Sequence, residues 1–481
     1  MNGARESAMS NRRVPESQSR LELQCAGQWL GLALGVLTLA GLFSLVVVIG
    51  RMPPFDRLVT DPLFFKRGLV VHVNLALVAW FYSFVAALLF FLPGRSAPSG
   101  LARHSVHVSA LGIAMMLLAA GMPGSQPVLS NYIPMIDHWL FGVGQIFFAA
   151  GVLTSFISRR LLAARTAGGG FFEIPSAAQM GLRSTAIVLV LAALTFAITS
   201  VRITPDLPID VYYELLFWGG GHVLQLCCSI AMISVWLILL HSSLGRSPIS
   251  ERAAAILFGA MVVPWLASPV LAVLGTWSPG YRDGFTFLMR WAIFPVLGLF
   301  MLACFRLLLV ELRAGRIGLR SLSDPRISGF LVSALLTLLG FALGAGIRGS
   351  NTMIPAHYHA SIGGITAAFM TVTYVMLRAF GFSISTRRLR RATAWQPAIY
   401  GVGQMVFASG FALAGIYGMS RKAYGAEQAG RGLGESIGLG VMGVGGLIAV
   451  VGGLLFLGVV ATIWRQGSER PIRTFKPVTE A

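Results

Sequence analysis

The stretch 354–364, IPAHYHASIGG, places two histidines one residue apart at the start of a hydrophobic run. An α-helix takes about 3.6 residues per turn, so side chains at positions i and i+2 lie roughly 200° apart around its axis. His357 and His359 are therefore predicted to point to opposite sides of one helix. We expect each of them to have a binding partner of its own rather than to share one small ion.

The composition of the chain is typical of a membrane protein with many spans. Of 481 residues, 56% are hydrophobic and only 11% are charged, and the mean hydropathy is +0.75. These values exclude a soluble core. The net charge of +19 comes from basic residues in short loops between apolar runs, which membrane topology explains and which does not imply a nucleic-acid partner. The expected surrounding is the lipid bilayer.

The apolar runs predict an all-α bundle of transmembrane helices. About 20 apolar residues are needed to cross the hydrocarbon core. The chain contains twelve such runs, at about 26–50, 66–93, 105–122, 138–158, 182–201, 212–241, 253–276, 284–312, 326–347, 354–380, 396–418 and 437–464. We expect one transmembrane domain over 26–464, with an N-terminal tail at 1–25 and a C-terminal tail at 465–481. The first helix is expected to be retained, because no cleavage site of small residues follows it.

The basic residues are distributed unevenly between the two sides of the predicted bundle. If the N-terminus is cytoplasmic, the cytoplasmic loops contain most of the arginines, whereas the loop GMPGSQPVLSNYIPMID before the fourth helix contains no Lys or Arg. This asymmetry follows the positive-inside rule for an even number of helices. We therefore expect both termini in the cytoplasm and the protein in a bacterial inner membrane. The four cysteines show no CxxC spacing, and neither disulfides nor a thiolate metal site is indicated.

Four of the eight histidines lie at a similar depth in the outer half of the predicted bilayer. His72, His222, His357 and His359 come from three helices that all run inward, and His138 lies on the same side but nearer the surface. Ionisable groups within a membrane are costly and usually functional, and a neutral imidazole can ligate a metal. A single histidine could equally be a hydrogen-bonded core residue, but four at one level favour a binding site.

Haem suits this arrangement better than a bare ion. A porphyrin is a flat apolar disc, and its iron can take one imidazole on each face. His357 and His359 could then hold two different haems on opposite sides of their helix. Gly363, Gly364 and the glycines at 219–221 remove side-chain bulk near these histidines, either to admit a macrocycle or to let helices pack closely.

The segments AHYHASIGG, HVNLALVAW and FWGGGHVLQ resemble the haem-copper oxidase superfamily, catalytic subunit I. The resemblance implies twelve helices, a low-spin haem between His72 and His359, and a high-spin haem on His357. His222 matches the helix 6 histidine that ligates copper or non-haem iron, so a reacting gas would bind between His357 and His222. The stretch HVNLALVAW is closer to the nitric oxide reductase and C-type branches.

Basic residues on the outer side add to the resemblance. GIYGMSRKAYGAEQ is similar to a stretch whose paired basic residues bind haem propionates, which implies that role for Arg421 and Lys422. Arginine forms bidentate, charge-assisted bonds with such carboxylates, although an ordinary basic loop is the alternative. Arg290, in FTFLMRWAIF, could neutralise a propionate or could be an arginine that snorkels from a helix end.

The sequence departs from the family at the second metal. The family takes two further imidazoles from helix 7, but AAAILFGAMVVPWLASPVLAVLG contains no histidine. Because copper and iron sites normally use three or more protein ligands, we expect less than one equivalent of tightly bound second metal.

Three functions remain open at this stage. The leading one is a membrane haem oxidoreductase that takes electrons from a c-type cytochrome or another redox subunit on the outer face and reduces oxygen or nitric oxide. The second is a non-catalytic electron-transfer or structural haem subunit of a respiratory complex. The third is a transporter in which the histidines relay protons.

Overall fold

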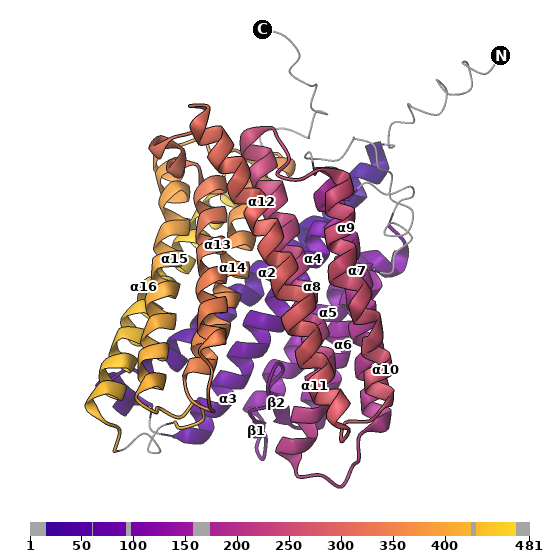
Figure 1. Ribbon diagram of the computed structural model, residues 1–481, viewed down its shortest axis with the longest axis vertical. Coiled ribbons are helices and arrows are strands. Elements are labelled where there is room, and N and C mark those ends of the chain that lie inside the picture. The colour runs from indigo at the N-terminus through magenta and orange to yellow at the C-terminus, as the bar shows by residue number, and fades with distance from the viewer. Residues whose placement is uncertain (1–15, 60, 93–97, 157–173, 425–429, 468–481) are drawn as a thin grey trace, which may run out of the picture.

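The structure is a computed structural model that describes residues 16–59, 61–92, 98–156, 174–424 and 430–467. These residues form an almost entirely helical bundle (Figure 1). The helices are α2 (Glu16–Ile49), α3 (Pro62–Val73), α4 (Trp80–Leu89), α5 (Gly100–Gly121), α6 (Trp139–Phe156), α7 (Ser176–Arg202), α8 (Ile209–Leu244), α9 (Glu251–Val262), α10 (Ser268–Val273), α11 (Pro279–Leu288), α12 (Phe294–Arg313), α13 (Pro325–Ala345), α14 (Met353–Ala379), α15 (Arg387–Ile416) and α16 (Leu433–Arg465).

Within the described residues, eleven helices are long and apolar enough to cross a membrane, and α6 is a shorter apolar helix described only to Phe156. The chain is an integral membrane protein, and the predicted all-α membrane bundle is confirmed. The structure begins the first helix at Glu16, before the expected span 26–50.

Local sequence explains where many helices begin. Asp61, Ser99, Asp324 and Thr386 each accept a hydrogen bond from a backbone N–H in the first turn of α3, α5, α13 and α15. Such residues satisfy amide groups that have no partner within the helix. Proline follows at the first helical position of α3 and α13, where its missing N–H has no cost.

Two helices form the centre of the bundle. In the apolar 18-residue stretch of α8 and of α14, 89% of the residues are buried within the protein, compared with 28% in α2 and in the span Glu251–Val273. These two central helices carry three of the four candidate histidines. These three histidines therefore lie on helices that are surrounded by other parts of the protein.

Three spans are interrupted by a change of helical pitch. A π-helix, η2 (Asn74–Ala79), joins α3 to α4, and a second one, η4 (Met289–Ile293), joins α11 to α12. A 3₁₀ segment, η3 (Val263–Ala267), lies between α9 and α10. π-Helical turns occur frequently at functional sites, and η2 begins two residues after His72.

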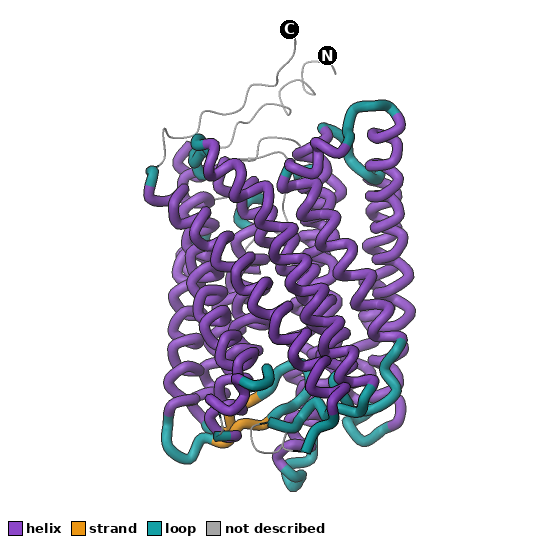
Figure 2. The backbone as a smooth tube through the Cα atoms, turned by 90° about the vertical axis from the view of Figure 1, so that its left-hand side faces the viewer, coloured by secondary structure: helices purple, strands orange, loops and turns teal. Residues whose placement is uncertain are grey.

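A short hairpin covers one end of the bundle. Strands β1 (Gln126–Val128) and β2 (Met135–Asp137) pair antiparallel between α5 and α6, at the end of the bundle opposite the start of α2 and the end of α16 (Figure 1; strands orange in Figure 2). Asn74 donates from Nδ2 to the carbonyl oxygen of Pro134 (2.7 Å). Arg67 donates from Nε to the carbonyl oxygen of Ser125 (2.9 Å). These bonds fix the hairpin to α3 and η2.

Candidate functional site

His72 is held in the last turn of α3 by a contact with the first helix. Its Nδ1 donates to the carbonyl oxygen of Ala40 in α2 (2.9 Å). A carbonyl oxygen can only accept, so this bond assigns the proton to Nδ1 and leaves Nε2 free to donate a lone pair. The side chain is half-buried.

His357 and His359 point to different neighbours, as their spacing predicts. Nδ1 of His357 donates to the carbonyl oxygen of Gly340 in α13 (2.7 Å). The ring of His359 lies against α15, with its centroid 4.7 Å from that of Phe407. The two imidazoles therefore face different neighbouring helices, α13 and α15.

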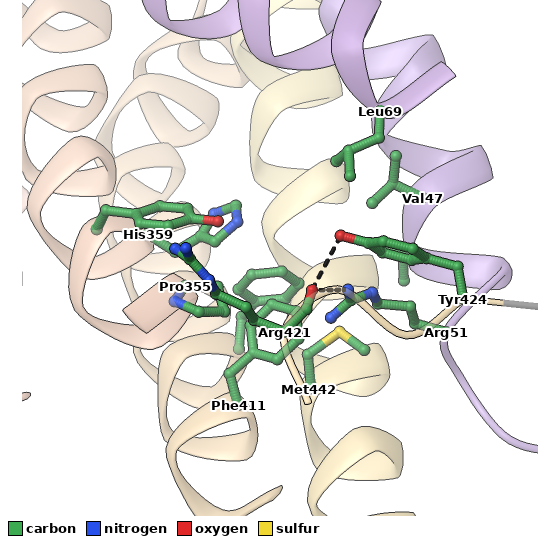
Figure 3. A pocket seen from close by; sticks show the side chains of 12 residues that line it. Val47, Arg51, Leu69, Pro355, His359, Phe411, Arg421, Tyr424 and Met442 are labelled. Atoms are coloured by element: carbon green, nitrogen blue, oxygen red, sulfur yellow. Dashed lines mark hydrogen bonds between the residues drawn. The ribbon is translucent and has the colours of Figure 1, made fainter. Parts of the chain in front are cut away.

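His359 opens into a pocket at the end of the bundle that also carries the hairpin (Figure 3). The pocket is formed by α2, α3, α14, α15, α16 and the loop after α15. Its polar lining includes His359, Arg51 and Arg421, together with Tyr358 and Tyr424. One imidazole and two guanidinium groups therefore border the same cavity. Leu69, one turn before His72 on α3, also lines it.

The two arginines of the pocket are bound by uncharged groups. Arg51 is 4% exposed, donates from Nη2 to the carbonyl oxygen of Arg421 (2.7 Å), and lies 4.4 Å from the centroid of the Tyr424 ring. Arg421 donates from Nη1 to Oδ1 of Asn131 (2.9 Å). Its buried Nε has no hydrogen-bond partner among the residues that the structure describes. Within the described part of the chain neither arginine forms an ion pair, so the pocket is suited to an anionic group.

Contacts between two loops bring Arg421 close to the start of α14. Asn351 forms an isolated β-bridge with Ser420, and the N–H of Thr352 donates to the carbonyl oxygen of Met419 (2.9 Å). The hydroxyl of Thr352 also donates to the carbonyl oxygen of Phe411 (2.9 Å). These contacts therefore hold Arg421, which follows Ser420, beside α14, the helix that carries His359.

The residues around this pocket fit a haem with two axial imidazoles. His72 and His359 would supply the nitrogen ligands, and a backbone bond to the other nitrogen, as at His72, is the usual way to fix such a ligand. Arg51 and Arg421 would supply positive charge for propionates. His357 has the same backbone anchoring on the opposite side of α14.

His222 lies in a different environment from the other three histidines. It is 1% exposed, and both of its ring nitrogens are bonded. Nδ1 donates to the carbonyl oxygen of Trp218 (2.7 Å), and Nε2 lies 2.8 Å from the hydroxyl of Tyr132. Burial, with the charge of Glu214 adding to it, raises the pKa of the Tyr132 phenol, which therefore stays protonated.

The residues present do not fit a second metal beside His222. Among the described residues, no group of three or more His, Cys, Asp or Glu side chains comes together. The span Glu251–Val273 contains no histidine. Glu214, two turns before His222, is engaged by Asn131, whose N–H donates to its Oε2 (2.8 Å).

The glycines near the histidines make room for neighbouring protein atoms. A Cβ at Gly219 would meet the ring of Phe285, and one at Gly220 would meet Phe196. At Gly221 it would meet the ring of Tyr132. Gly363 faces Gln404, and Gly364 faces Ser333 and Thr337. Of the two alternatives, the structure supports close packing rather than clearance for a macrocycle.

The remaining candidates lie away from the pocket or on its rim. Arg290 is exposed within η4, which favours the alternative of a snorkelling arginine over a residue that neutralises a propionate. Lys422 is exposed next to Arg421. His138 accepts a hydrogen bond at Nδ1 from the N–H of Leu140 (3.2 Å) and so caps α6.

Three residues of this region were not predicted from the sequence: Arg51, Asn131 and Tyr132. Arg51 could have been identified from the sequence. It follows the first helix on the side with few basic residues, where the positive-inside rule disfavours a cation. Asn131 and Tyr132 lie in a loop without periodicity, and no pattern in the sequence places them beside α8.

Comparisons with known proteins agree with this architecture. A solved heme-copper terminal oxidase dimer superposes with a TM-score of 0.69, covering 96% of this chain and 86% of that chain, at 15% sequence identity. The chain has the fold of a haem-copper terminal oxidase. At this identity the likeness concerns the fold, and chemistry has to be argued from the site.

Relatives by sequence carry no functional description. A protein of Rickettsia prowazekii (strain Madrid E), named as uncharacterized, is 28% identical over an alignment that covers 90% of this chain and 94% of that protein. An uncharacterized protein of Aquifex aeolicus (strain VF5) is 27% identical over 74% of this chain and 85% of that protein. No protein-family model matches the chain.

Proposed function

We propose that the chain is a membrane haem oxidoreductase that binds two haems, one between His72 and His359 and one on His357. The observation that carries the proposal is the pocket in which His359, Arg51 and Arg421 meet at one end of the bundle, beside Leu69 of α3, the helix that carries His72. Electrons would enter from a c-type cytochrome or another redox subunit at the outer face. The acceptor would be a small gas such as oxygen or nitric oxide.

The chain's own residues orient and neutralise the cofactors. The bonds of His72 to Ala40 and of His357 to Gly340 fix each ring and keep Nε2 available. Arg51 and Arg421, with Lys422 at the rim, balance the propionates. Haem iron held in this way exchanges single electrons at a potential that its ligands and burial set.

A second candidate function is a non-catalytic electron-transfer or structural haem subunit. It is favoured by the state of His222, whose Nε2 is bonded to Tyr132 rather than free for a metal. Carbon monoxide separates the two candidates, since only a five-coordinate haem on His357 with an open face would bind it. A transporter is less well supported, because it assigns no role to the arginines of the pocket.

The experiment is spectroscopy of the purified chain. We expect a reduced-minus-oxidised spectrum with low-spin haem bands, and a pyridine haemochrome assay that gives two haems per chain. His72→Ala and His359→Ala should each abolish the low-spin bands and leave the haem on His357. His107→Ala is the matched control, since this exposed histidine lies on α5 outside the site. A correctly folded chain without haem absorption would refute the proposal.

A further inference from the structure

The tip of the hairpin between β1 and β2 has a strained backbone. Tyr132 is the non-glycine residue with positive φ (65°) in the described chain. It is the centre of a γ-turn, in which the N–H of Ile133 donates to the carbonyl oxygen of Asn131 (2.8 Å). A γ-turn with positive φ at a bulky residue is rare and persists only where the surrounding structure enforces it.

The contacts of Tyr132 explain why this conformation is retained. Its hydroxyl lies 2.8 Å from Nε2 of His222, and the two ring centroids are 4.6 Å apart. Gly221 leaves the space that the phenol ring fills, because a Cβ there would overlap it. The neighbouring Asn131 is fixed as well, between Glu214 and Arg421. The turn is therefore clamped on both sides.

The direction of the hydrogen bond follows from the network. The carbonyl oxygen of Trp218 can only accept, so Nδ1 of His222 carries the proton of the neutral ring. Nε2 is then the acceptor, and the Tyr132 hydroxyl is the donor. The lone pair that would bind a metal is occupied by a hydrogen bond from the chain itself.

We propose that Tyr132 takes the place of a second metal, so that the chain has a fixed, metal-free tyrosine–histidine pair at His222. A metal bound to an imidazole lies about 2.0–2.1 Å from the nitrogen, in the direction that the hydroxyl oxygen blocks at 2.8 Å. Glu214 cannot serve as a replacement ligand without leaving Asn131. The inference concerns this chain's own side chains and stands whether or not haems bind at the other histidines.

The first test measures the histidine ring nitrogens of the full chain by NMR after selective ¹⁵N-histidine labelling. His222→Gln assigns the signals of His222 by their loss. We expect a neutral ring protonated at Nδ1, with Nε2 shifted by an accepted hydrogen bond. Tyr132→Phe should move Nε2 to the position of a free acceptor, and Tyr212→Phe, which removes a hydroxyl from the same end of α8, should not. A metal-bound Nε2 in the wild-type protein would overturn the proposal.

The second test is metal content after incubation with copper, zinc or ferrous iron and removal of loosely bound ions. We expect the wild-type protein and His222→Gln to retain the same amount of non-haem metal. A stoichiometric metal that His222→Gln loses would refute the tyrosine–histidine pair. If His222→Gln does not fold, the metal content of the wild-type protein still tests the pair, because one stoichiometric tightly bound non-haem metal would contradict it. Gly221→Ala provides an independent check, since it should displace the phenol and reproduce the NMR change of Tyr132→Phe.

Discussion

Three of the candidate histidines are anchored by the same kind of hydrogen bond, with different consequences. His72, His222 and His357 each donate from Nδ1 to a backbone carbonyl oxygen, of Ala40, Trp218 and Gly340 respectively. The anchored ring can then use only Nε2. In His222 this nitrogen meets Tyr132, whereas no such bond is found for His72 and His357 among the described residues. The hydrogen bond from Tyr132 therefore distinguishes His222, whose Nε2 is occupied, from His72 and His357, whose Nε2 could bind iron.

Arg51 provides a prediction at the residue scale. Replacement by leucine removes the buried charge beside Arg421, and a charge-assisted hydrogen bond contributes about 1.5–3 kcal/mol. We therefore expect Arg51→Leu to weaken haem retention about tenfold or more, measured as haem per chain after dilution or competition with an apo-haem protein. Arg57→Leu, an exposed arginine in η1 (Phe55–Leu58), is the control. Equal retention in both variants would contradict the role of Arg51.

At the scale of elements, α15 and α16 are packed through glycines. A Cβ at Gly403 would meet the backbone of Ala449, and one at Gly410 would meet the backbone of Met442. Such close approach depends on the missing side chains, since lipid gives no hydrophobic driving force between helices. This contact supports the pocket, because Phe411 of α15 and Met442 of α16 both line it.

Gly410→Ala should therefore destabilise the bundle. The added methyl meets backbone that cannot rotate away, and overpacking costs about 1–3 kcal/mol. Gly440→Ala is the matched control on α16, where a Cβ meets nothing within 4 Å, and it should be neutral or slightly stabilising. All four cysteines are free and buried, so thermal unfolding can be followed by their reaction with a thiol-specific dye. A variant Gly410→Ala that melts like the wild type would refute this account of the contact.

At the scale of the molecule, the pocket and the hairpin occupy the same end of the bundle, and α2 begins and α16 ends at the other end (Figure 1). This arrangement agrees with an even number of crossings. The charge asymmetry of the loops then predicts that the pocket faces outward and that both termini are cytoplasmic. An electron donor outside the membrane would meet the end that carries Arg51 and Arg421.

The predicted orientation is testable by labelling. Ser350→Cys and Ser247→Cys each introduce an exposed thiol, in the loop before α14 and in the loop after α8 respectively. In right-side-out spheroplasts, a membrane-impermeant maleimide should label Ser350→Cys and should spare Ser247→Cys until the cells are opened. The native cysteines, being buried, give a low background. The reverse pattern would invert the topology.

The sequence by itself determined the helical membrane bundle, the positions of most spans and the opposed directions of His357 and His359. These features depend on apolar run length and on helical pitch, which are local properties of the chain. It also shows that the span Glu251–Val273 contains no histidine, and the expectation of an incomplete second metal site remains a prediction.

Only the tertiary structure decided what fills that site and what surrounds the pocket. Tyr132 meets His222 across 90 residues, and Arg51 meets the loop of Arg421 across 370. Contacts between loops and helices so far apart depend on how the whole bundle packs, and neither hydrophobic periodicity nor residue spacing contains them. For the same reason the glycines at 219–221, which could have cleared space for a cofactor, were assigned to packing only once Phe285, Phe196 and Tyr132 were located against them.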